Sequence, residues 1–388
     1  MGWEVGGIIL AGLLLFAGLM AWQIRRRQMQ LWLPTYVRER NRYLAPKPDE
    51  EVHVILCFAD HYEPKAGNAS IEAGRQRVAT WVERYPQQFG GFRDSDGRSP
   101  RHSFFFPIEE YEKEYLDALA SLCRAGFGEV EMHLHHDNDT PEGLRAKLLS
   151  FKKILIGHGL LSRHRQSGAV MYGFIHGNWT LCNSRPDGRY CGVDHEIPIL
   201  LETGCYADFT FPSAPSATQP PIINRIYWAS DRPGPRSQDI ALPAGAPTDN
   251  ALLMVQGPLL LNWGRRKWGI LPGIENACLQ STQPPSMERL EQWLQARVQT
   301  PARPDWFFVK LHAHGAPEYD QEALLGAPMV QFHEDLAKRA RDNPKFHYHY
   351  VTAREMVNLI KAAQAGYKGS VADALDWELV SNIGNFRA

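Results

Sequence analysis

Residues 52–60 read VHVILCFAD, an almost unbroken apolar run that ends in an aspartate. Such a run is typical of a strand in a parallel sheet, because helices cover both faces of that sheet and bury both sides of the strand. Further strands are predicted at 101–107, 128–135, 167–177, 206–212, 251–263, 305–315 and 345–352. Helices are predicted at 70–89, 109–124, 140–157, 286–299, 321–341 and 352–365. This alternation predicts an α/β fold with a mainly parallel sheet, either a barrel or an open doubly wound sheet.

The composition is that of an ordinary globular protein. The chain has 388 residues, of which 44% are hydrophobic, so it is long enough for one large α/β domain or two smaller ones. Its 42 Lys and Arg balance 43 Asp and Glu, which gives no support to a nucleic-acid partner. The 6 cysteines form no Cys-x-x-Cys pair, and we expect buried free thiols in a reducing compartment.

The amino-terminal segment differs from the rest of the chain. The run from Val5 to Trp22 carries no charge and would be about 27 Å long as a helix, which matches the hydrocarbon core of a bilayer. A cleaved signal peptide normally has basic residues before its apolar run, whereas here Glu4 precedes the run and Arg25–Arg27 follow it. We therefore predict an uncleaved transmembrane anchor over 1–24. The arginines after it predict a single-pass inner-membrane protein whose soluble part is cytoplasmic.

Three further segments are expected beyond the anchor. A basic, proline-containing linker covers 25–50, the α/β domain covers 51–366 and a carboxyl-terminal tail covers 367–388. Within the domain, 178–250 is rich in Pro, Gly and Ser and resists assignment to helices or strands. We expect this stretch to form insertion loops around a site.

Ionisable side chains gather where four of the predicted strands end. The residues concerned are Asp60, His61, Glu63, His133, His135, His136, Asp137, Asp139, His176, His312 and His314. Because the carboxyl ends of parallel strands meet at one edge of a sheet, we expect these side chains to converge. A solvated loop or a core histidine would explain one such strand end, and the coincidence of four favours a site.

The residue types at these strand ends are those of a metal-dependent hydrolase. Imidazole nitrogen and carboxylate oxygen are the ligands that Zn²⁺ takes in catalytic sites. Such an ion activates water and polarises a carbonyl group, while a separate base and acid move the protons. The strand ends supply an aspartate, two or three clustered histidines and a distant histidine on another strand, and so predict a divalent metal cofactor, with zinc favoured.

The motifs resemble those of the polysaccharide deacetylase superfamily (NodB-homology, carbohydrate esterase family 4) over roughly residues 50–365. Phe58-Ala59-Asp60 is similar to the family's Phe-Asp-Asp motif, which implies that Asp60 is a metal ligand and that Ala59 stands at the position of the usual catalytic base. Leu311-His312 is similar to the family's last motif, which implies that His312 is the general acid. The family's fold, a distorted (β/α)7 barrel, is what this resemblance implies for the domain.

The other motifs depart further from the family pattern. His133 matches the first histidine of the family's His-Ser/Thr-x-x-His motif, but Asp137 stands in place of the second, so that Asp137, His135 or His136 completes the ligand set. The stretch FIHGNW (174–179) occupies the place of the motif that lines the substrate groove, although the family's Arg-x-x-Pro-Tyr pattern is absent from it. The stretch ETGCYADFTFPSAP (202–215) suggests the diverged WalW-like branch of the family.

The resemblance implies a role for each candidate residue. The expected metal ligands are Asp60, His133, His135 and His136, the expected catalytic residues are His312, Asp137 and Asp139, and the expected substrate-binding residues are His176, Asn178, Trp179 and Asp208. Because Ala59 cannot act as a base, the base is Asp137, Asp139, Glu63, Asp208 or a histidine of 133–136, or catalysis has been lost.

The resemblance implies a membrane-anchored deacetylase-like hydrolase. Its substrate would be an acylated saccharide, lipid-linked or nucleotide-activated if the domain is cytoplasmic, in the biosynthesis of an exopolysaccharide or another envelope glycan. Two alternatives stay open. One is a non-catalytic saccharide-binding or scaffold protein of the same fold, and the other is a hydrolase of a non-peptide C–N bond in a non-sugar substrate.

Overall fold

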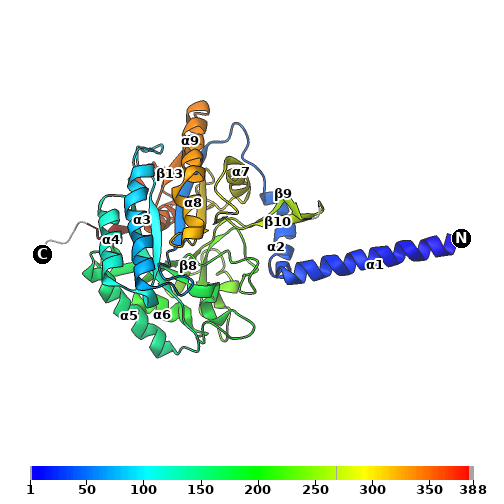
Figure 1. The fold of residues 1–388 in the computed structure, drawn as a ribbon, viewed down its shortest axis with the longest axis horizontal. Helices are drawn as coiled ribbons and strands as arrows, with labels where there is room; N and C mark the ends of the chain where they lie inside the picture. Colours follow the sequence, from blue (N-terminus) through cyan, green and yellow to red (C-terminus); the bar gives the residue numbers. More distant parts are fainter. Residues whose placement is uncertain (1, 268, 384–388) are drawn as a thin grey trace.

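A mostly parallel sheet lies at the centre of the computed structural model, which describes residues 2–267 and 269–383 (Figure 1). Its strands are β1 (Val52–His61), β2 (His102–Pro107), β3 (Gly128–Leu134), β5 (Val170–His176), β6 (Cys205–Asp208), β7 (Ile226–Ser230), β8 (Ala251–Val255), β11 (Cys278–Leu279), β12 (Trp306–Ala313) and β13 (Phe346–Tyr350). Hydrogen-bonded neighbours follow the order β11-β12-β1-β2-β3-β5-β6-β8-β7, and β13 pairs with the first half of β1. Among these strands only the β7–β8 pairing is antiparallel. The predicted α/β fold with a mainly parallel sheet is confirmed.

Helices cover both faces of this sheet, which explains why β1 is apolar on both sides. One face carries α3 (Ile71–Phe89), α4 (Lys113–Arg124), α5 (Pro141–Gly157), α6 (Glu196–Thr203), α7 (Met287–Gln295), α8 (Glu318–Leu325) and α9 (Ala327–Asp342). The opposite face packs against α10 (Ala353–Gln364). Along β1, the side chains of Leu56 and Phe58 belong to the first hydrophobic cluster, and those of Cys57 and Ala59 belong to the second. Successive residues of a strand therefore face different surroundings.

Local signals in the sequence correctly place several helix starts. Thr140 is the N-cap of α5, with Pro141 as the first helical residue, and its side chain accepts a hydrogen bond from the backbone N–H of Gly143. Thr352 and Glu355 form the capping box that opens α10. Each cap satisfies a free backbone N–H of the first helical turn and so fixes where the loop after a strand becomes a helix.

The strand order does not close on itself in the part of the chain that the structure describes. It runs from β11 to β7, and no pairing joins these two strands. The distorted barrel that the family resemblance implies therefore stays a prediction.

A long apolar helix, α1 (Gly2–Arg26), begins the chain and extends away from the rest of the protein (Figure 1). The part from Val5 to Arg26 is long and apolar enough to span a membrane, and the apolar 18-residue stretch within it is not buried inside the protein. A signal sequence at this position would have the same properties. The prediction of an apolar amino-terminal helix is confirmed, whereas its topology stays a prediction.

The segment predicted as a linker is in part packed against the domain. It contains η1 (Met29–Leu31), α2 (Leu33–Arg38) and η2 (Arg40–Arg42). The Trp32 side chain is fully buried in a small hydrophobic cluster with Ala214, Ile223 and Leu259. This contact explains why a basic, Pro-containing segment becomes ordered: it covers apolar surface of the insertion that follows β6.

The remaining elements are short. They are η3 (Ile108–Glu110), β4 (Ser162–His164), η4 (Gly177–Trp179), η5 (Leu181–Asn183), η6 (Ser237–Asp239), β9 (Leu260–Lys267), β10 (Leu271–Glu275), η7 (Ala372–Ala374) and β14 (Leu379–Ser381). The strand predicted at 251–263 is thus two strands, β8 and β9. Within the predicted tail 367–388, β14 pairs with β4, and residues 384–388 lie outside the described residues. All six cysteines are free thiols, and five of them are buried.

Candidate functional site

Three side chains of metal-ligand type meet at the carboxyl end of the sheet. His61 is the last residue of β1, Glu63 follows two residues later, and His133 lies near the end of β3. One ligand atom from each lies within 4.8 Å of the other two, and Nε2 of His133 is 3.2 Å from Oε1 of Glu63. Ligand atoms that share a tetrahedral zinc ion lie roughly 3 to 3.5 Å apart. We call these three residues the strand-end cluster.

Further aromatic rings surround the strand-end cluster. The ring centroid of His61 lies 4.9 Å from that of His133, 4.7 Å from that of His314 and 6.4 Å from that of His312. The indole of Trp179 lies 6.0 Å from His61 and 6.1 Å from His314. The rings converge because β12 pairs with β1 so that His312 lies beside Ala59, while β2 brings β3 close on the other side. The prediction that ends of distant strands meet holds for His133 and His312.

One side of this cluster is accessible. The His133 side chain is fully buried, but that of Glu63 is 14% exposed and that of His135 is 31% exposed. His314 and Trp179 are only partly buried. A molecule from solvent can therefore approach the cluster from the side of these residues.

Two polar atoms at the site have no hydrogen-bond partner among the described residues. They are Nδ1 of His312 and Nε1 of Trp179, and both are buried. Because more than about 90% of buried polar groups are hydrogen-bonded, such atoms indicate a place for water or a ligand. Trp179 also has a φ of 56°, and the φ of Asn178 before it is 53°. Non-glycine residues in this region are strained, and such strain is concentrated at functional sites.

The charges at the site are controlled by burial and by the packing of several imidazoles together. Burial, followed by the neighbouring His314 and His133, lowers the pKa of His61 well below its usual value. Burial, Lys310 and His314 likewise lower the pKa of His312 well below its usual value. Burial would raise the pKa of Glu63, but the hydrogen bond and the charge interaction with His133 outweigh it and lower this pKa to about 2. Near neutral pH, Glu63 is therefore a carboxylate, and His61 in the same cluster is a neutral imidazole.

Asp60, the predicted first metal ligand, lies outside this cluster. Its Oδ2 is 2.9 Å from Nε2 of His102, and its Oδ1 accepts a hydrogen bond of 2.7 Å from the backbone N–H of Gly315. Since side chains alternate along a strand, Asp60 and His61 point to opposite faces. The assignment of Asp60 as a ligand beside His133 is therefore corrected: the β1 residue that lies beside His133 is His61.

Asp208 and Lys310 lie buried near the site. Asp208 is hydrogen-bonded to Oγ1 and N of Thr210, and burial raises its pKa to about 7. The Lys310 ammonium donates to the carbonyls of Phe209 and Phe211, each at 2.6 Å, and burial lowers its pKa to about 7. Asp208 was predicted to bind substrate, but it is only 1% exposed and its oxygens are used within the core.

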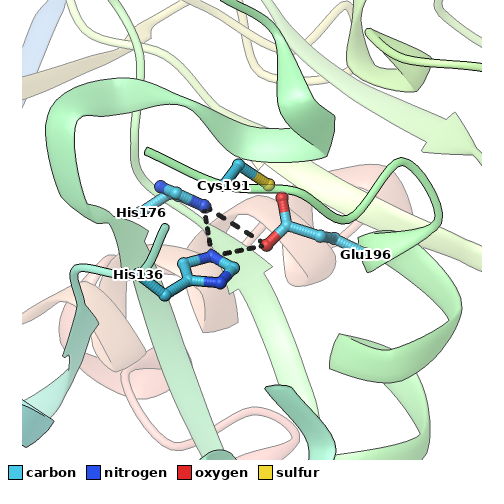
Figure 2. Close-up of side chains that lie close together, drawn as sticks. All are labelled: His136, His176, Cys191 and Glu196. Atoms are coloured by element: carbon cyan, nitrogen blue, oxygen red, sulfur yellow. Dashed lines mark hydrogen bonds and ion pairs between the residues drawn. The ribbon is translucent and has the colours of Figure 1, made fainter. Parts of the chain in front are cut away.

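A second group of ligand-type side chains lies apart from the strand-end cluster. It consists of His136, His176, Cys191 and Glu196, all buried, and we call it the loop cluster because three of the four flank or lie within the loop after β5 (Figure 2). His136 and His176 were predicted as a ligand of the strand-end ion and as a substrate-binding residue, respectively. The structure instead places both in the loop cluster. The four predicted metal ligands therefore do not gather around one point.

The remaining predicted residues support these two clusters. Asp137 accepts a hydrogen bond of 2.6 Å from the backbone N–H of Tyr190, and Asp139 lies against His136. Neither aspartate therefore belongs to the strand-end cluster, where a base would act. His135 lies at the rim, between Glu109 and Glu63. Asn178 is partly buried and lies in η4, between His176 of the loop cluster and Trp179, whose ring lies near His61.

A third group, Glu51, His53 and His347, lies at the opposite end of the sheet, where β1 and β13 begin. The Glu51 side chain is 62% exposed and that of His347 is 32% exposed. Acidic and imidazole groups on a solvated surface commonly lie together without a metal. A substitution in this group is therefore a suitable control for substitutions in the other two clusters.

Sequence patterns identify some of these residues and not others. His61 and His133 end predicted strands, and the alternation of β1 is the signal that separates His61 from Asp60. Cys191 and Glu196 lie in the stretch 178–250, which carries no helical or strand periodicity that would relate them to His136. Only the folded arrangement brings them together.

No family model matches this chain, and no curated protein matches it significantly.

Proposed function

We propose that this protein is a metal-dependent hydrolase whose divalent cation, with zinc favoured, binds His61, Glu63 and His133. The observation that carries the proposal is the convergence of these three ligand atoms within 4.8 Å at an accessible strand-end site. Three protein ligands with room for a further group are typical of catalytic zinc sites. Glu63 supplies the negative charge, and His61 and His133 supply imidazole nitrogens as ligand atoms.

The domain is proposed to be a distorted barrel of the polysaccharide-deacetylase type with one unpaired seam. Support comes from contacts across the gap between β12 and the segment after β6. The Lys310 ammonium of β12 donates to the carbonyls of Phe209 and Phe211, and a Cβ at Gly257 would lie 2.4 Å from the Lys310 carbonyl oxygen. These contacts bring the two sides of the sheet together without strand pairing.

When bound, the cation supplies Lewis acidity, which polarises an acyl carbonyl and makes a nearby water more acidic. His312 is proposed to take the proton from the attacking water and to return it to the leaving group, because its Nδ1 is free of other partners. This assignment gives one histidine both roles and removes the need for a carboxylate at Ala59. The indole N–H of Trp179, also without a partner in the described chain, is proposed to donate to the substrate.

The proposed substrate is an acylated saccharide, carried by a lipid or a nucleotide, in exopolysaccharide or envelope-glycan biosynthesis. The family resemblance supports the acyl–sugar linkage, and the half-exposed Trp179 offers a flat apolar surface for a sugar ring. The anchor supports a membrane-proximal substrate. The arginines at 25–27 and in the following segment support a cytoplasmic location at the inner membrane.

Acetate release from the full-length protein tests this proposal. The protein is purified in detergent with zinc, and incubated with N-acetylated and O-acetylated oligosaccharides and with nucleotide-linked N-acetylhexosamines. We expect acetate release that is lost in His61→Ala and in His133→Ala. The matched control is His347→Gln. It alters the third group, which lies at the opposite end of the sheet, and should keep full activity. Equal activity of the His61→Ala and wild-type proteins would contradict the proposal, and so would the absence of acetate release from every substrate of this panel.

A further inference from the structure

The loop cluster brings together four side chains that are far apart in the sequence. His136 follows β3, His176 ends β5, Cys191 lies in the loop, and Glu196 begins α6. The side chains of His136, His176 and Glu196 are 0% exposed, and Cys191 is fully buried. Figure 2 shows the imidazole rings and the carboxylate pointing toward one another, with the sulfur of Cys191 beside the carboxylate.

Hydrogen bonds fix which ring nitrogen of each histidine points into the cluster. Nδ1 of His176 lies 2.6 Å from the carbonyl oxygen of Gly177, which can only accept, so this nitrogen carries the hydrogen. Nδ1 of His136 lies 2.9 Å from Oδ2 of Asp139, which also accepts a hydrogen bond of 2.7 Å from the Lys147 ammonium. A carboxylate paired with an ammonium is an acceptor, so Nδ1 of His136 is also a donor. With both imidazoles neutral, both Nε2 atoms present lone pairs to the centre of the cluster.

Three electron-rich atoms meet at that centre. The two Nε2 atoms are 2.7 Å apart, and each is 3.3 Å from Oε1 of Glu196. Oε1 has no hydrogen-bond partner in the described part of the chain, whereas Oε2 of the same carboxylate accepts from the backbone N–H of Cys182. A buried carboxylate oxygen without a donor is unfavourable. Lone pairs that converge in this way are satisfied by a metal ion between them or by a proton on one imidazole that bridges the two Nε2 atoms.

The donor set indicates which cation. Two imidazole nitrogens, a sulfur and a carboxylate oxygen are four donors of the kinds that zinc binds, and their ligand atoms all lie within 4.8 Å of one another. The Cys191 side chain accepts a hydrogen bond of 3.3 Å from the backbone N–H of Val193 and, as a thiol, donates one of 3.3 Å to the Val193 carbonyl, so zinc would take the place of the thiol proton. Ligating histidines characteristically donate their other N–H to a carbonyl or a carboxylate, as His176 and His136 do.

We propose that His136, His176, Cys191 and Glu196 bind a structural zinc ion, separate from the ion of the strand-end cluster. Four protein donors complete a tetrahedral zinc site, and the burial of all four leaves no position for substrate. The strand-end cluster differs in having three donors and partly exposed neighbours. The structural site does not depend on the hydrolase proposal, because it is built from different residues.

The ion would hold the loop that carries Trp179. His176 lies directly before the loop, Glu196 directly after it, and His136 connects both to β3. Between them the chain forms only the short turns η4 and η5, so regular hydrogen bonding contributes little to its shape. Fixing the loop at both ends and at Cys191 keeps the Trp179 indole beside His61 and His314. The structural ion is therefore a positioning device for the strand-end site.

Metal content distinguishes the two sites. The full-length protein is purified in detergent without chelators, and zinc per chain is measured by elemental analysis. We expect two equivalents in the wild type, one in the double variant His136→Gln/Glu196→Gln, and one in the double variant His61→Ala/His133→Ala. The control variant His347→Gln alters the third group, Glu51, His53 and His347, and should retain two equivalents of zinc. If the His136→Gln/Glu196→Gln variant holds as much zinc as the wild type, the structural site is wrong. If the His61→Ala/His133→Ala variant holds as much zinc as the wild type, only the strand-end ion is wrong.

Cobalt substitution provides a test whose deciding measurement is made on the wild-type protein. Of the two sites, only the loop cluster contains a sulfur ligand, so wild-type protein loaded with Co²⁺ should show a thiolate-to-cobalt charge-transfer band. Cys191→Ser, which keeps the size and the hydrogen-bonding capacity of the side chain, should abolish this band, and His61→Ala should leave it. Cobalt-loaded wild type without the band would refute the proposal.

Proteolysis tests the role of the ion in holding the loop. Arg189 is exposed in the loop and is followed by Tyr190, so it is a potential trypsin site, whereas Pro186 prevents cleavage after Arg185. We expect chelator treatment of the wild type to increase cleavage after Arg189 at least tenfold, and zinc to reverse the increase. Without chelator, the His61→Ala variant, which retains the structural ion, should be cleaved no faster than the wild type. Equal cleavage with and without chelator would show that the loop does not depend on a metal.

Discussion

Asp60 and His61 are adjacent in the chain, yet their side chains lie on opposite faces of the sheet. Asp60 is hydrogen-bonded to His102 and to the backbone N–H of Gly315, and is completely buried. His61 packs against the ring of His133 at the accessible edge. The first residue thus fastens the ends of β1 and β12 together, while the second contributes to the candidate metal site.

This division predicts different effects for two substitutions. Asp60→Ala leaves the Gly315 N–H and the His102 ring without their partner, and should lower the free energy of unfolding by about 3 kcal/mol. It should not change the zinc content of the folded protein, whereas His61→Ala should remove one equivalent. Urea unfolding and elemental analysis of the full-length proteins in detergent measure both effects. Loss of the strand-end ion in folded Asp60→Ala would show that the carboxylate is a ligand after all.

Local patterns in the sequence were sufficient to predict the framework around these residues. The apolar run of β1, the N-cap at Thr140 and the capping box at Thr352 each depend on neighbours within a few residues. The convergence of His133 and His312 also followed from a general rule, because parallel strands end at one edge. Such features require no knowledge of long-range contacts.

The assignment of individual ligands could not be predicted in the same way. A shift of one residue along a strand moves a side chain to the other face, so the motif at Phe58-Ala59-Asp60 could not by itself decide between Asp60 and His61. Cys191 and Glu196 were not predicted, because their positions depend on how the loop after β5 folds back toward His136. That path is determined by tertiary contacts, such as the hydrogen bond from the Asp139 N–H to the Cys191 carbonyl.

His312 is expected to be required for catalysis but not for metal binding. His312→Gln keeps a polar side chain of similar length but cannot exchange a proton near neutral pH. Positioned proton transfer contributes roughly 10² to 10⁴-fold to rate, so we expect kcat to fall by about that factor with two zinc equivalents retained. Acetate release and elemental analysis on the same preparation make the comparison. A variant that keeps wild-type kcat would exclude His312 as the proton carrier.

Trp179 is expected to act mainly in substrate binding. Trp179→Ala removes the indole beside His61 and His314 and should raise KM by about tenfold, as expected for the loss of roughly 1.4 kcal/mol of ring contact. Trp179→Phe keeps an aromatic surface but removes the N–H donor, and should have an intermediate KM. Steady-state kinetics with the best acetylated substrate measure the series. Equal KM values in all three proteins would mean that the indole does not contact substrate.

A buried carboxylate away from the site should make the stability pH-dependent. Glu355 is 3% exposed and contacts the guanidinium groups of Arg98, Arg101 and Arg354. Burial would raise its pKa, but these three charges outweigh burial and lower the pKa from 4.5 to about 2. A carboxyl group whose pKa is lower in the folded state stabilises the protein above its unfolded pKa. This contribution is lost as pH falls from about 4.5 toward 2.

Glu355→Gln should therefore reduce stability near neutral pH and weaken the pH dependence in acid. Removing one partner from a buried ionic network typically costs about 3 to 5 kcal/mol, because the guanidinium groups keep their charge. Urea unfolding at pH 7, 5, 4 and 3 should show a difference between variant and wild type that narrows as pH falls. A constant difference across this range would indicate that Glu355 is not ionised in the folded protein. Glu72→Gln, an exposed carboxylate on α3, is the comparison variant.

The helix α1 is expected to be the membrane anchor of the full-length protein. Deleting residues 2–22 removes the apolar run but keeps Arg27, whose guanidinium donates to the carbonyl of Pro272, and the buried Trp32. The shortened chain should therefore fold and move from the membrane fraction to the soluble fraction. Arg265→Glu/Arg266→Glu in the full-length chain alters exposed charges on β9 and should leave the protein resistant to extraction by alkaline carbonate, because burial of an apolar helix in lipid does not depend on surface charge. If the deleted chain stays in the membrane fraction after a high-salt wash, residues other than α1 hold it there, and the anchor assignment is wrong.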